Sequence, residues 1–366
     1  MALHIGFIGL GLIGGSIAKA LRANLEDLRI TAYDINKNTL TAAFAEGIID
    51  VTASAINDVF ADCDFLFLCA PVQKNDANLA AVKAVISPKC ILTDVGSVKT
   101  QIHKHIAAAG LQRQFIGGHP MAGSERFGYA NSKASLLENA YYILTPTEET
   151  STQQLESYQN LVNAMGAIPL CLSCEQHDYV TAAVSHLPHV IASSLVNLVQ
   201  ASDSADGIMK MIAAGGFKDI TRIASSAPGM WQQICLTNTD NISSLLDDYI
   251  QALQLIKQEL DSRNADTLYQ FFDDARVYRD SFVNASSGPI KRCYEFTVDI
   301  ADQAGSIASI TTILAANGVS IKNIGITHNR EQQIGALRLE FEDEKSLEKA
   351  KALLTARSYI IYEKSL

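Results

Sequence analysis

The chain has 366 residues, of which 48% are hydrophobic and 19% charged, and a formal net charge of −10. This length predicts two or three domains, because one ordinary core does not grow to this size. The acidic balance argues against a nucleic-acid partner, and the lack of an apolar run near about 20 residues argues against a membrane span. Seven scattered cysteines and a start without a basic n-region favour a cytoplasmic protein.

Glycines separate the first predicted strand, residues 3–9, from a helical pattern. Their G-x-G-x-x-G spacing is typical of dinucleotide sites, where the glycines allow a tight turn, close approach of a pyrophosphate and packing of the helix on the strand. The N-terminus of that helix would face the phosphates with its partial positive charge. The predicted cofactor-binding residues of this turn are Gly9, Gly11, Leu12, Ile13 and Gly14.

A second predicted strand, residues 29–34, ends in Asp34, 20 residues after the last of these glycines. A carboxylate at this place can bind the ribose 2′-hydroxyl and repels a 2′-phosphate, so the sequence favours NAD over NADP. The next predicted strand, residues 64–72, turns at Ala70 and Pro71, which we also expect to contact the cofactor. The alternative is a Rossmann-type domain that has lost its ligand.

Two candidate catalytic side chains follow later strands. Ser97 comes after a strand that begins at residue 90, and it could share a hydrogen-bond network with a histidine or simply cap its helix. His119 lies in GGHPMAGSERFG, residues 117–128, where four glycines and Pro120 predict a loop after a strand that ends at 116. Such loops bind ligands in open α/β sheets, and an imidazole with an ordinary pKa of about 6.5 can accept a proton at neutral pH. His119 could instead cap a backbone group.

Further strands are predicted at residues 140–146 and 167–173. With them, residues 1–172 read as an α/β Rossmann-type domain that binds NAD. Cys171 and Cys174 form a lone C-x-x-C. A metal site would need a fourth ligand at recognisable spacing, so we expect no metal.

No strand pattern is visible from residue 173 to about 286, where apolar residues recur at helical spacing. We expect an all-α domain over residues 173–286, and such long apolar helices after a Rossmann unit favour a homodimer. Pro188, in the run SHLPH at 185–189, should kink one helix and free backbone groups. Arg222 presents a planar fork that suits a carboxylate, or it forms a structural ion pair with Asp219.

After the predicted linker SSGP, six elements read β-α-β-β-α-β. This order predicts an α+β ferredoxin-like domain over residues 293–366, large enough for a small core of its own. Gly305 and Ser306 form a turn after its first strand, and Asn317 and Asn323 bracket the start of the second. These four residues are candidates for binding an amino-acid effector. A domain that only helps dimerisation is the alternative.

These motifs together resemble the bacterial prephenate dehydrogenases, enzymes of tyrosine biosynthesis that include arogenate-using relatives. The most specific parts are GGHPMAGSE, HDYV…SHLPH and FKDITRIA…MW in that order, and the resemblance covers essentially the whole chain. The C-terminal unit resembles an ACT domain, a regulatory module that binds amino acids. Its usual D-x-P-G-type turn has Ala304 in place of proline, which leaves the identity of the effector open.

The resemblance implies a role for each site residue. His119 matches the catalytic histidine, which bonds the ring hydroxyl of the substrate, and Ser97 matches the serine of D-x-G-S-V-K near the nicotinamide. Arg222 matches the arginine that binds a substrate carboxylate, and His189 matches the second histidine of S-H-L-P-H in the substrate site. The residues that match further positions around the pocket are Glu125, His177, Asp219 and Trp231.

The implied reaction is the oxidation of prephenate by NAD, with loss of carbon dioxide and formation of 4-hydroxyphenylpyruvate. We expect feedback regulation by an aromatic amino acid, with tyrosine as the first candidate. Dehydrogenation of arogenate, giving tyrosine directly, stays open, although the resemblance places a histidine at position 189 in prephenate users. A 3-hydroxyacyl-CoA-type dehydrogenase and a non-catalytic amino-acid sensor stay open as well.

Overall fold

The structure is a computed structural model that describes residues 2–70, 72–123, 126–284, 294–301, 303, 305–328 and 334–362. Pro71 and Glu125, both predicted site residues, lie outside the described residues, as does the predicted linker at 286–289. The chain divides into two compact units, Met1–Gln258 and Glu259–Leu366. The domain limits predicted at residues 172, 286 and 293 stay predictions.

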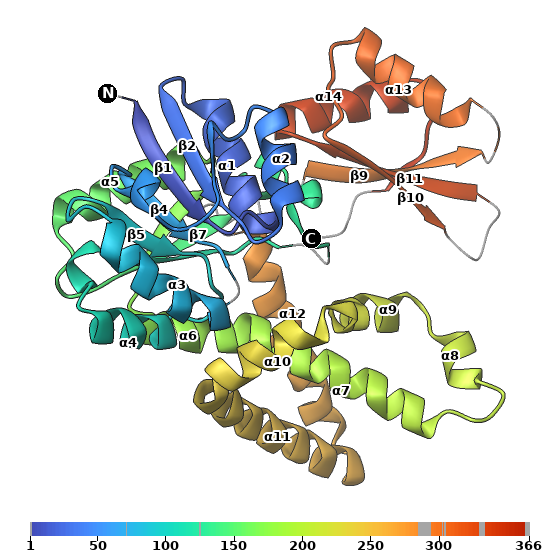
Figure 1. The fold of residues 1–366 in the computed structure, drawn as a ribbon. Coiled ribbons are helices and arrows are strands. Elements are labelled where there is room, and N and C mark those ends of the chain that lie inside the picture. Colours follow the sequence, from blue (N-terminus) through green and yellow to red (C-terminus); the bar gives the residue numbers. More distant parts are fainter. Residues whose placement is uncertain are drawn as a thin grey trace. The chain divides into compact units, whose positions relative to one another are not determined.

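The first unit begins with a five-stranded parallel sheet in the order β3-β2-β1-β4-β5 (Figure 1). The Phe7 and Phe67 rings stack 5.1 Å apart in its core. Its strands are β1 (Leu3–Ile8), β2 (Leu28–Tyr33), β3 (Val51–Ala53), β4 (Phe65–Leu68) and β5 (Ile91–Asp94). The helices between them are α1 (Leu12–Asn24), α2 (Lys37–Ala45), α3 (Val72–Val85) and α4 (Thr100–Ala109). This strand order confirms the predicted Rossmann-type fold.

The glycine turn between β1 and α1 has the tight geometry that its sequence predicts. Gly9 has a φ of +95°, and a Cβ there would lie 2.8 Å from the backbone nitrogen of Ala70. A Cβ on Gly14 would lie 2.8 Å from the carbonyl oxygen of Gly9, so α1 packs closely on the end of β1. Among the described residues, no atom lies within 4 Å of a Cβ built on Gly11, which leaves room for a pyrophosphate beside the backbone.

A second sheet, in the order β6-β7-β8, joins β5 through the pair Leu92–Phe115, and it corrects the strand end predicted at 116. Strand β6 continues through Gly117, Gly118 and His119. His119 pairs with Ile143 of the antiparallel neighbour β7. A Cβ on Gly118 would lie 2.7 Å from the Tyr158 hydroxyl, so glycine here permits close packing and does not break the strand. The elements are β6 (Ile116–Pro120), β7 (Tyr141–Pro146), α5 (Thr152–Ala164) and β8 (Ile168–Cys171).

Helices follow from residue 174 onward, as predicted. The first begins with a capping box, in which the side chains of Ser173 and Gln176 each accept the other's backbone amide. A π-helical segment, η5, ends two residues before Pro188, so the backbone departs from α geometry close to the predicted kink. The helices are α6 (Cys174–Thr181), η5 (Ala182–His186), α7 (Leu187–Ser202), α8 (Ile208–Ile212), α9 (Gly215–Thr221), α10 (Pro228–Thr237) and α11 (Thr239–Asp261). Short 3-10 helices are η1 (Asp58–Phe60), η2 (Gln112–Gln114), η3 (Tyr129–Asn131), η4 (Ala134–Leu136) and η6 (Arg222–Ser225).

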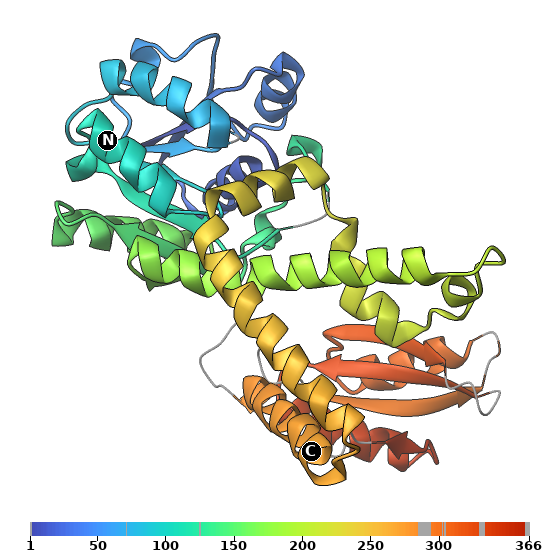
Figure 2. The same cartoon turned by 90° about the horizontal axis from the view of Figure 1, so that it is seen from below.

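The helical run Cys174–Ser202, drawn in green as one rod in Figure 2, is long and apolar enough to cross a membrane by length and composition. This differs from the expectation that no such run exists. The run nevertheless carries His177, Asp178 and His186, which are buried and hydrogen-bonded to other elements. These hydrogen bonds attach the N-terminal part of the run, residues 177–186, to the rest of the protein.

The second unit contains α12 and a four-stranded antiparallel sheet in the order β10-β11-β9-β12 (Figure 1). The Phe296 and Phe341 rings lie 5.3 Å apart in its core. The elements are α12 (Ala265–Asn284), β9 (Tyr294–Ala301), α13 (Ser306–Ala316), β10 (Asn323–His328), β11 (Ile334–Phe341), α14 (Glu344–Thr355) and β12 (Ile361–Tyr362). The order β-α-β-β-α-β from β9 onward confirms the predicted ferredoxin-like fold.

Candidate active site

A buried lysine that the sequence did not indicate joins the carboxyl ends of β5 and β6. The Nζ of Lys99 donates to Asp94 Oδ2 at 2.5 Å and to the carbonyl oxygen of Gly118 at 2.7 Å, and its side chain is fully buried. The amide of Gly118 in turn donates to Asp94 Oδ1 at 3.3 Å. Ser97 lies between Asp94 and Lys99 in the chain, and Gly118 precedes His119. These bonds therefore hold the two segments that carry the predicted catalytic residues next to each other.

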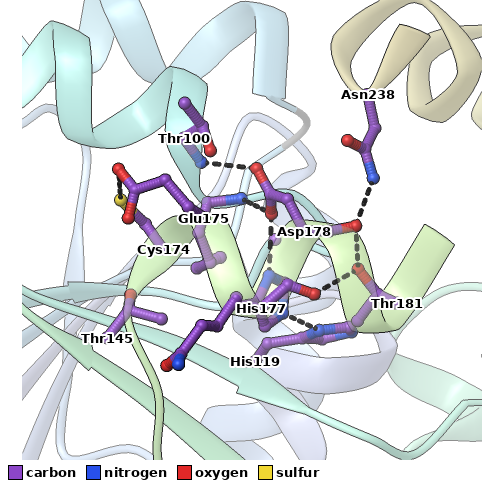
Figure 3. A network of polar contacts seen from close by, with 12 residues as sticks. Thr100, His119, Thr145, Cys174, Glu175, His177, Asp178, Thr181 and Asn238 are labelled. Atoms are coloured by element: carbon purple, nitrogen blue, oxygen red, sulfur yellow. Dashed lines mark hydrogen bonds and ion pairs between the residues drawn. The ribbon is translucent and has the colours of Figure 1, made fainter. Parts of the chain in front are cut away.

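His119 is one end of a chain of polar contacts that crosses from β6 to α6 (Figure 3). Its Nδ1 lies 2.7 Å from His177 Nε2, and the two rings meet edge to face with centroids 5.0 Å apart. His177 Nδ1 lies 2.8 Å from Asp178 Oδ1. The structure thus brings the predicted His177 to His119, and it adds Asp178, which sequence reasoning missed.

Asp178 accepts hydrogen bonds from two elements besides its own. Its Oδ1 and Oδ2 accept the backbone amides of Lys99 at 2.7 Å and Thr100 at 2.8 Å. Because Lys99, the N-cap of α4, makes no side-chain cap bond, Asp178 caps this helix from α6. The carbonyl oxygen of Asp178 accepts Asn238 Nδ2 at 2.8 Å. Burial alone would raise the pKa of Asp178, but hydrogen bonds from His177 and the two amides outweigh it and lower this pKa.

The histidines of the site are held in their neutral form. Burial lowers the pKa of His119 well below its ordinary value, and the neighbouring His177 and Lys99 add to this shift. Burial also lowers the pKa of His177, although Asp178 opposes it. For His186, burial is again the main cause, and its pKa falls to about 4. A neutral imidazole is the form that can accept a proton, so His119 is a base at neutral pH.

Trp231 contacts His189, a predicted residue of the substrate site, and also His186. His189 stacks on its ring with centroids 3.6 Å apart, and His186 meets the ring edge-on at 6.0 Å. The indole Nε1 is buried and has no hydrogen-bond partner among the described residues. Burial lowers the pKa of His189, and the charge of Arg222 adds to the shift, which places Arg222 near this ring. Asp219 lies on α9 with an exposed side chain.

The cofactor side is built around Asp34 and the glycine turn. Asp34 Oδ2 accepts the amide of Leu10 at 2.7 Å, and Oδ1 accepts the amide of Asn36 at 2.7 Å. Each carboxylate oxygen has a second lone pair, so Asp34 can still accept bonds from ribose hydroxyls. Together with the open backbone at Gly11, these residues fit a dinucleotide.

The second unit has a cavity of about 240 Å³ beside its own glycine turn. Gly305, with a φ of +93°, is the N-cap of α13, and both it and Ser306 line the cavity. Asn317 and Asn323 do not: the side chain of Asn317 donates to the Ile313 carbonyl at 2.8 Å, and Asn323 Oδ1 accepts the next amide of its strand at 2.9 Å. The remaining lining residues are Asp299, Ile300, Gln303, Ser309 and Tyr359.

Two family models match the first part of the chain. "Prephenate dehydrogenase, nucleotide-binding domain" matches residues 17–169, and "Prephenate dehydrogenase, dimerization domain" matches residues 173–274. The prephenate dehydrogenase of Bacillus subtilis (strain 168) is 39% identical over 352 residues, which are 96% of this chain and 95% of that protein. The chain belongs to the prephenate dehydrogenase family.

Solved structures of the family extend the match. A crystal structure of the A. aeolicus prephenate dehydrogenase in complex with hydroxyphenyl propionate and NAD+ has 32% identity and a TM-score of 0.72, covering 77% of this chain and 98% of that one. The Synechocystis arogenate dehydrogenase has 28% identity and a TM-score of 0.69, covering 76% of this chain and 99% of that one.

Membership of the prephenate dehydrogenase family confirms three predictions: the family itself, the class of NAD-dependent oxidoreductases, and NAD as the cofactor. The chain therefore has the prephenate dehydrogenase activity of tyrosine biosynthesis. A 3-hydroxyacyl-CoA-type dehydrogenase and a non-catalytic sensor are set aside. The roles of the individual residues stay predictions.

Proposed function

We propose that His119 is the base in the oxidative decarboxylation of prephenate, and that Ser97 shares the hydrogen-bond network of the reacting hydroxyl. The observation that carries this proposal is a neutral His119 whose Nδ1 is engaged by His177. The other ring nitrogen, Nε2, is then the atom that takes the hydroxyl proton. NAD, when bound, accepts the hydride from the hydroxyl-bearing ring carbon, and carbon dioxide leaves as the ring becomes aromatic.

On the substrate side, Arg222 pairs with a carboxylate through its planar guanidinium. The stacked rings of His189 and Trp231 form a flat wall for the ring of the substrate, supported by their 3.6 Å separation. The buried indole Nε1 of Trp231 can donate to a substrate oxygen. Asp219 and Glu125 are included around the pocket on the resemblance alone.

On the cofactor side, the pyrophosphate lies over the glycine turn and the N-terminus of α1, and Asp34 binds the adenosine ribose. The open backbone at Gly11 supports the first assignment, and the free lone pairs of Asp34 support the second. The residues assigned to NAD are Gly9, Gly11, Leu12, Ile13, Gly14, Asp34, Ala70 and Pro71.

Prephenate is the better substrate in this proposal, and arogenate the alternative. The two differ in a keto or an amino group on the side chain. The preference for prephenate rests on the resemblance, which places a histidine at position 189 in prephenate users. Nδ1 of His189 donates to the Ser185 carbonyl at 2.9 Å, so the neutral ring has a lone pair on Nε2, and Nε2 can donate to a keto oxygen only when the ring is protonated at acid pH. The test is NADH formation with each substrate and each cofactor across pH, in which the preference for prephenate should grow as pH falls. A larger kcat/KM for arogenate at every pH would contradict the proposal.

The ferredoxin-like domain of the second unit is, in this proposal, an ACT-type module that binds an aromatic amino acid, first of all tyrosine. Its cavity offers the Asp299 carboxylate for an ammonium group and the hydroxyls of Ser306 and Ser309 for a carboxylate. The alignment with the B. subtilis protein spans 96% of the chain and so includes most of this domain.

The helical part matches the family's dimerisation domain, and the proposal includes a homodimer in the cytoplasm. Large apolar side chains are exposed on α7, α8 and α11 in a single chain, and burial against a second copy would remove them from water. They include Leu198, Met211, Ile212, Leu253 and Leu255. Sedimentation of the purified protein as a monomer at micromolar concentration would contradict this part.

A further inference from the structure

The contacts of Asp178 determine where the proton of His177 lies. The Asp178 carboxylate is ionised, because its two oxygens accept the amides of Lys99 and Thr100, and an ionised carboxylate only accepts hydrogen bonds. His177 Nδ1, 2.8 Å from Oδ1, therefore carries a hydrogen. A neutral imidazole has one N–H, so His177 Nε2 holds a lone pair.

The position of the His177 proton in turn determines where the proton of His119 lies. Its Nδ1 lies 2.7 Å from the Nε2 of His177, which is an acceptor, so the His119 Nδ1 donates. A neutral His119 then has its lone pair on Nε2. The opposite tautomer would present an N–H at Nε2 and could not accept the proton of a hydroxyl group.

Asp178 also holds the segment that carries Ser97. Its carboxylate binds the first two amides of α4, and Ser97 lies two residues before the first of them, Lys99. One carboxylate on α6 thus restrains both the imidazole chain and the start of the loop after β5.

We propose that His177 and Asp178 are positioning residues, which fix the tautomer of His119 with its proton on Nδ1 and its lone pair on Nε2. This inference rests on His119 being the base of the proposed function. It differs from the role that the resemblance gives His177, a place around the substrate pocket. A pocket residue would act on substrate binding, whereas a positioning residue acts on the chemical step.

The experiment compares two substitutions of His177 in the full-length protein. In His177→Gln, the amide oxygen can still accept from His119 Nδ1, and we expect kcat within about tenfold of the parent. In His177→Leu, nothing accepts this hydrogen, and we expect kcat to fall on the order of 10²-fold, with KM for prephenate changed by less than about threefold. A rise in KM at unchanged kcat in His177→Leu would overturn the inference.

The matched control is His103→Leu. His103 is a partly buried histidine of α4, with Nε2 2.9 Å from the Thr145 hydroxyl. We expect its loss to leave kcat near the parent value. If both leucine variants lose kcat equally, the loss comes from packing and the inference fails.

A spectroscopic measurement tests the tautomer without any loss of activity. Protein labelled with 15N-histidine, with the His119 signals assigned from His119→Asn, should show the directly bonded proton of His119 on Nδ1. A proton on Nε2 in the parent protein would overturn the inference. If His119→Asn itself keeps full kcat, the proposed function fails, whereas full kcat in His177→Leu alone would defeat only the positioning role.

Discussion

Lys99 donates from its buried Nζ to the carbonyl oxygen of Gly118 at 2.7 Å, so an ammonium group at the start of α4 is bonded to the residue before His119. Burial lowers the pKa of Lys99, and the carboxylates of Asp94 and Asp178 oppose this shift. The lysine is therefore part of a buried ion pair that cannot lose one member without leaving a buried charge.

We predict that Lys99→Met lowers the free energy of unfolding by about 3–5 kcal/mol, because Asp94 is left buried and uncompensated. Urea unfolding monitored by circular dichroism measures this loss. The double variant Lys99→Met, Asp94→Asn removes both charges and should lose less than the single variant. An unchanged urea midpoint in Lys99→Met would contradict the prediction.

His119→Asn should keep the fold and NAD binding, but lower kcat about 10²–10⁴-fold, the usual worth of a positioned general base. Steady-state kinetics with prephenate measures the loss, and thermal unfolding with NAD titration provides the control. A kcat within about threefold of the parent would remove His119 from the mechanism.

The pH dependence of the parent enzyme follows from the lowered pKa of His119. Protonation removes the base, so kcat should be level through neutral pH and fall only on the acid side, below the ordinary histidine range. The profile of log kcat against pH should then rise through one ionisation and level off. An acid limb centred above pH 7 would show that burial does not lower the pKa of His119 as the structure indicates.

Asp34→Ser should weaken the binding of NAD and remove the charge that repels the 2′-phosphate of NADP. The matched control is Asp34→Asn, which keeps an acceptor for the Leu10 amide but removes the charge. We expect the ratio of kcat/KM for NADP over NAD to rise in both variants. A parent enzyme that already prefers NADP would refute the role of Asp34.

Arg222→Gln should raise KM for prephenate about 10–150-fold, since a charge-assisted pair contributes about 1.5–3 kcal/mol. The melting temperature should change little, because the Arg222 side chain is exposed and its truncation leaves no cavity in the core. If Arg222 instead serves a structural pair with Asp219, both Arg222→Gln and Asp219→Asn should lower the melting temperature while KM stays nearly constant.

Tyrosine should inhibit the full-length enzyme but not a chain that ends near Ser287, because the candidate catalytic residues all lie before residue 232. Inhibition requires tighter binding to the less active state, typically by about 1–3 kcal/mol. Since a truncated chain can fold poorly, Ser309→Leu, which fills the cavity of the second unit, provides an independent variant. Equal inhibition of all three proteins, or no response to any aromatic amino acid, would contradict the regulatory role.

The sequence predicted the elements whose signals are local. β1, β2 and β4 are apolar runs beside glycine or acidic turn residues, and the ferredoxin-like order follows from clear alternation of strand and helix. β3 was not predicted, because three residues, Val51–Ala53, are too short for a pattern.

β6 was misjudged because the reason for its glycines is not local. Gly118 is required by Tyr158 and Asp94, which come from other parts of the chain. Lys99 and Asp178 were missed for a related reason: charged side chains are usually solvated, and their burial becomes visible only when α6 packs on the N-terminus of α4.

The π-helical segment η5 has a consequence for how this chain can vary. An α-helix turns about 100° per residue, so residues eight apart would differ in direction by about 80°. Yet Asn238 Nδ2 reaches both the Asp178 carbonyl at 2.8 Å and His186 Nδ1 at 3.2 Å, because each residue of the wider turn rotates the chain less. The π-helical segment η5 thus accommodates one more residue than an α-helix would for the same rotation of the chain. Deleting one residue between 182 and 185 would therefore restore α geometry while His189 keeps its direction toward Trp231, so this stretch should tolerate a one-residue deletion that a regular α-helix would not.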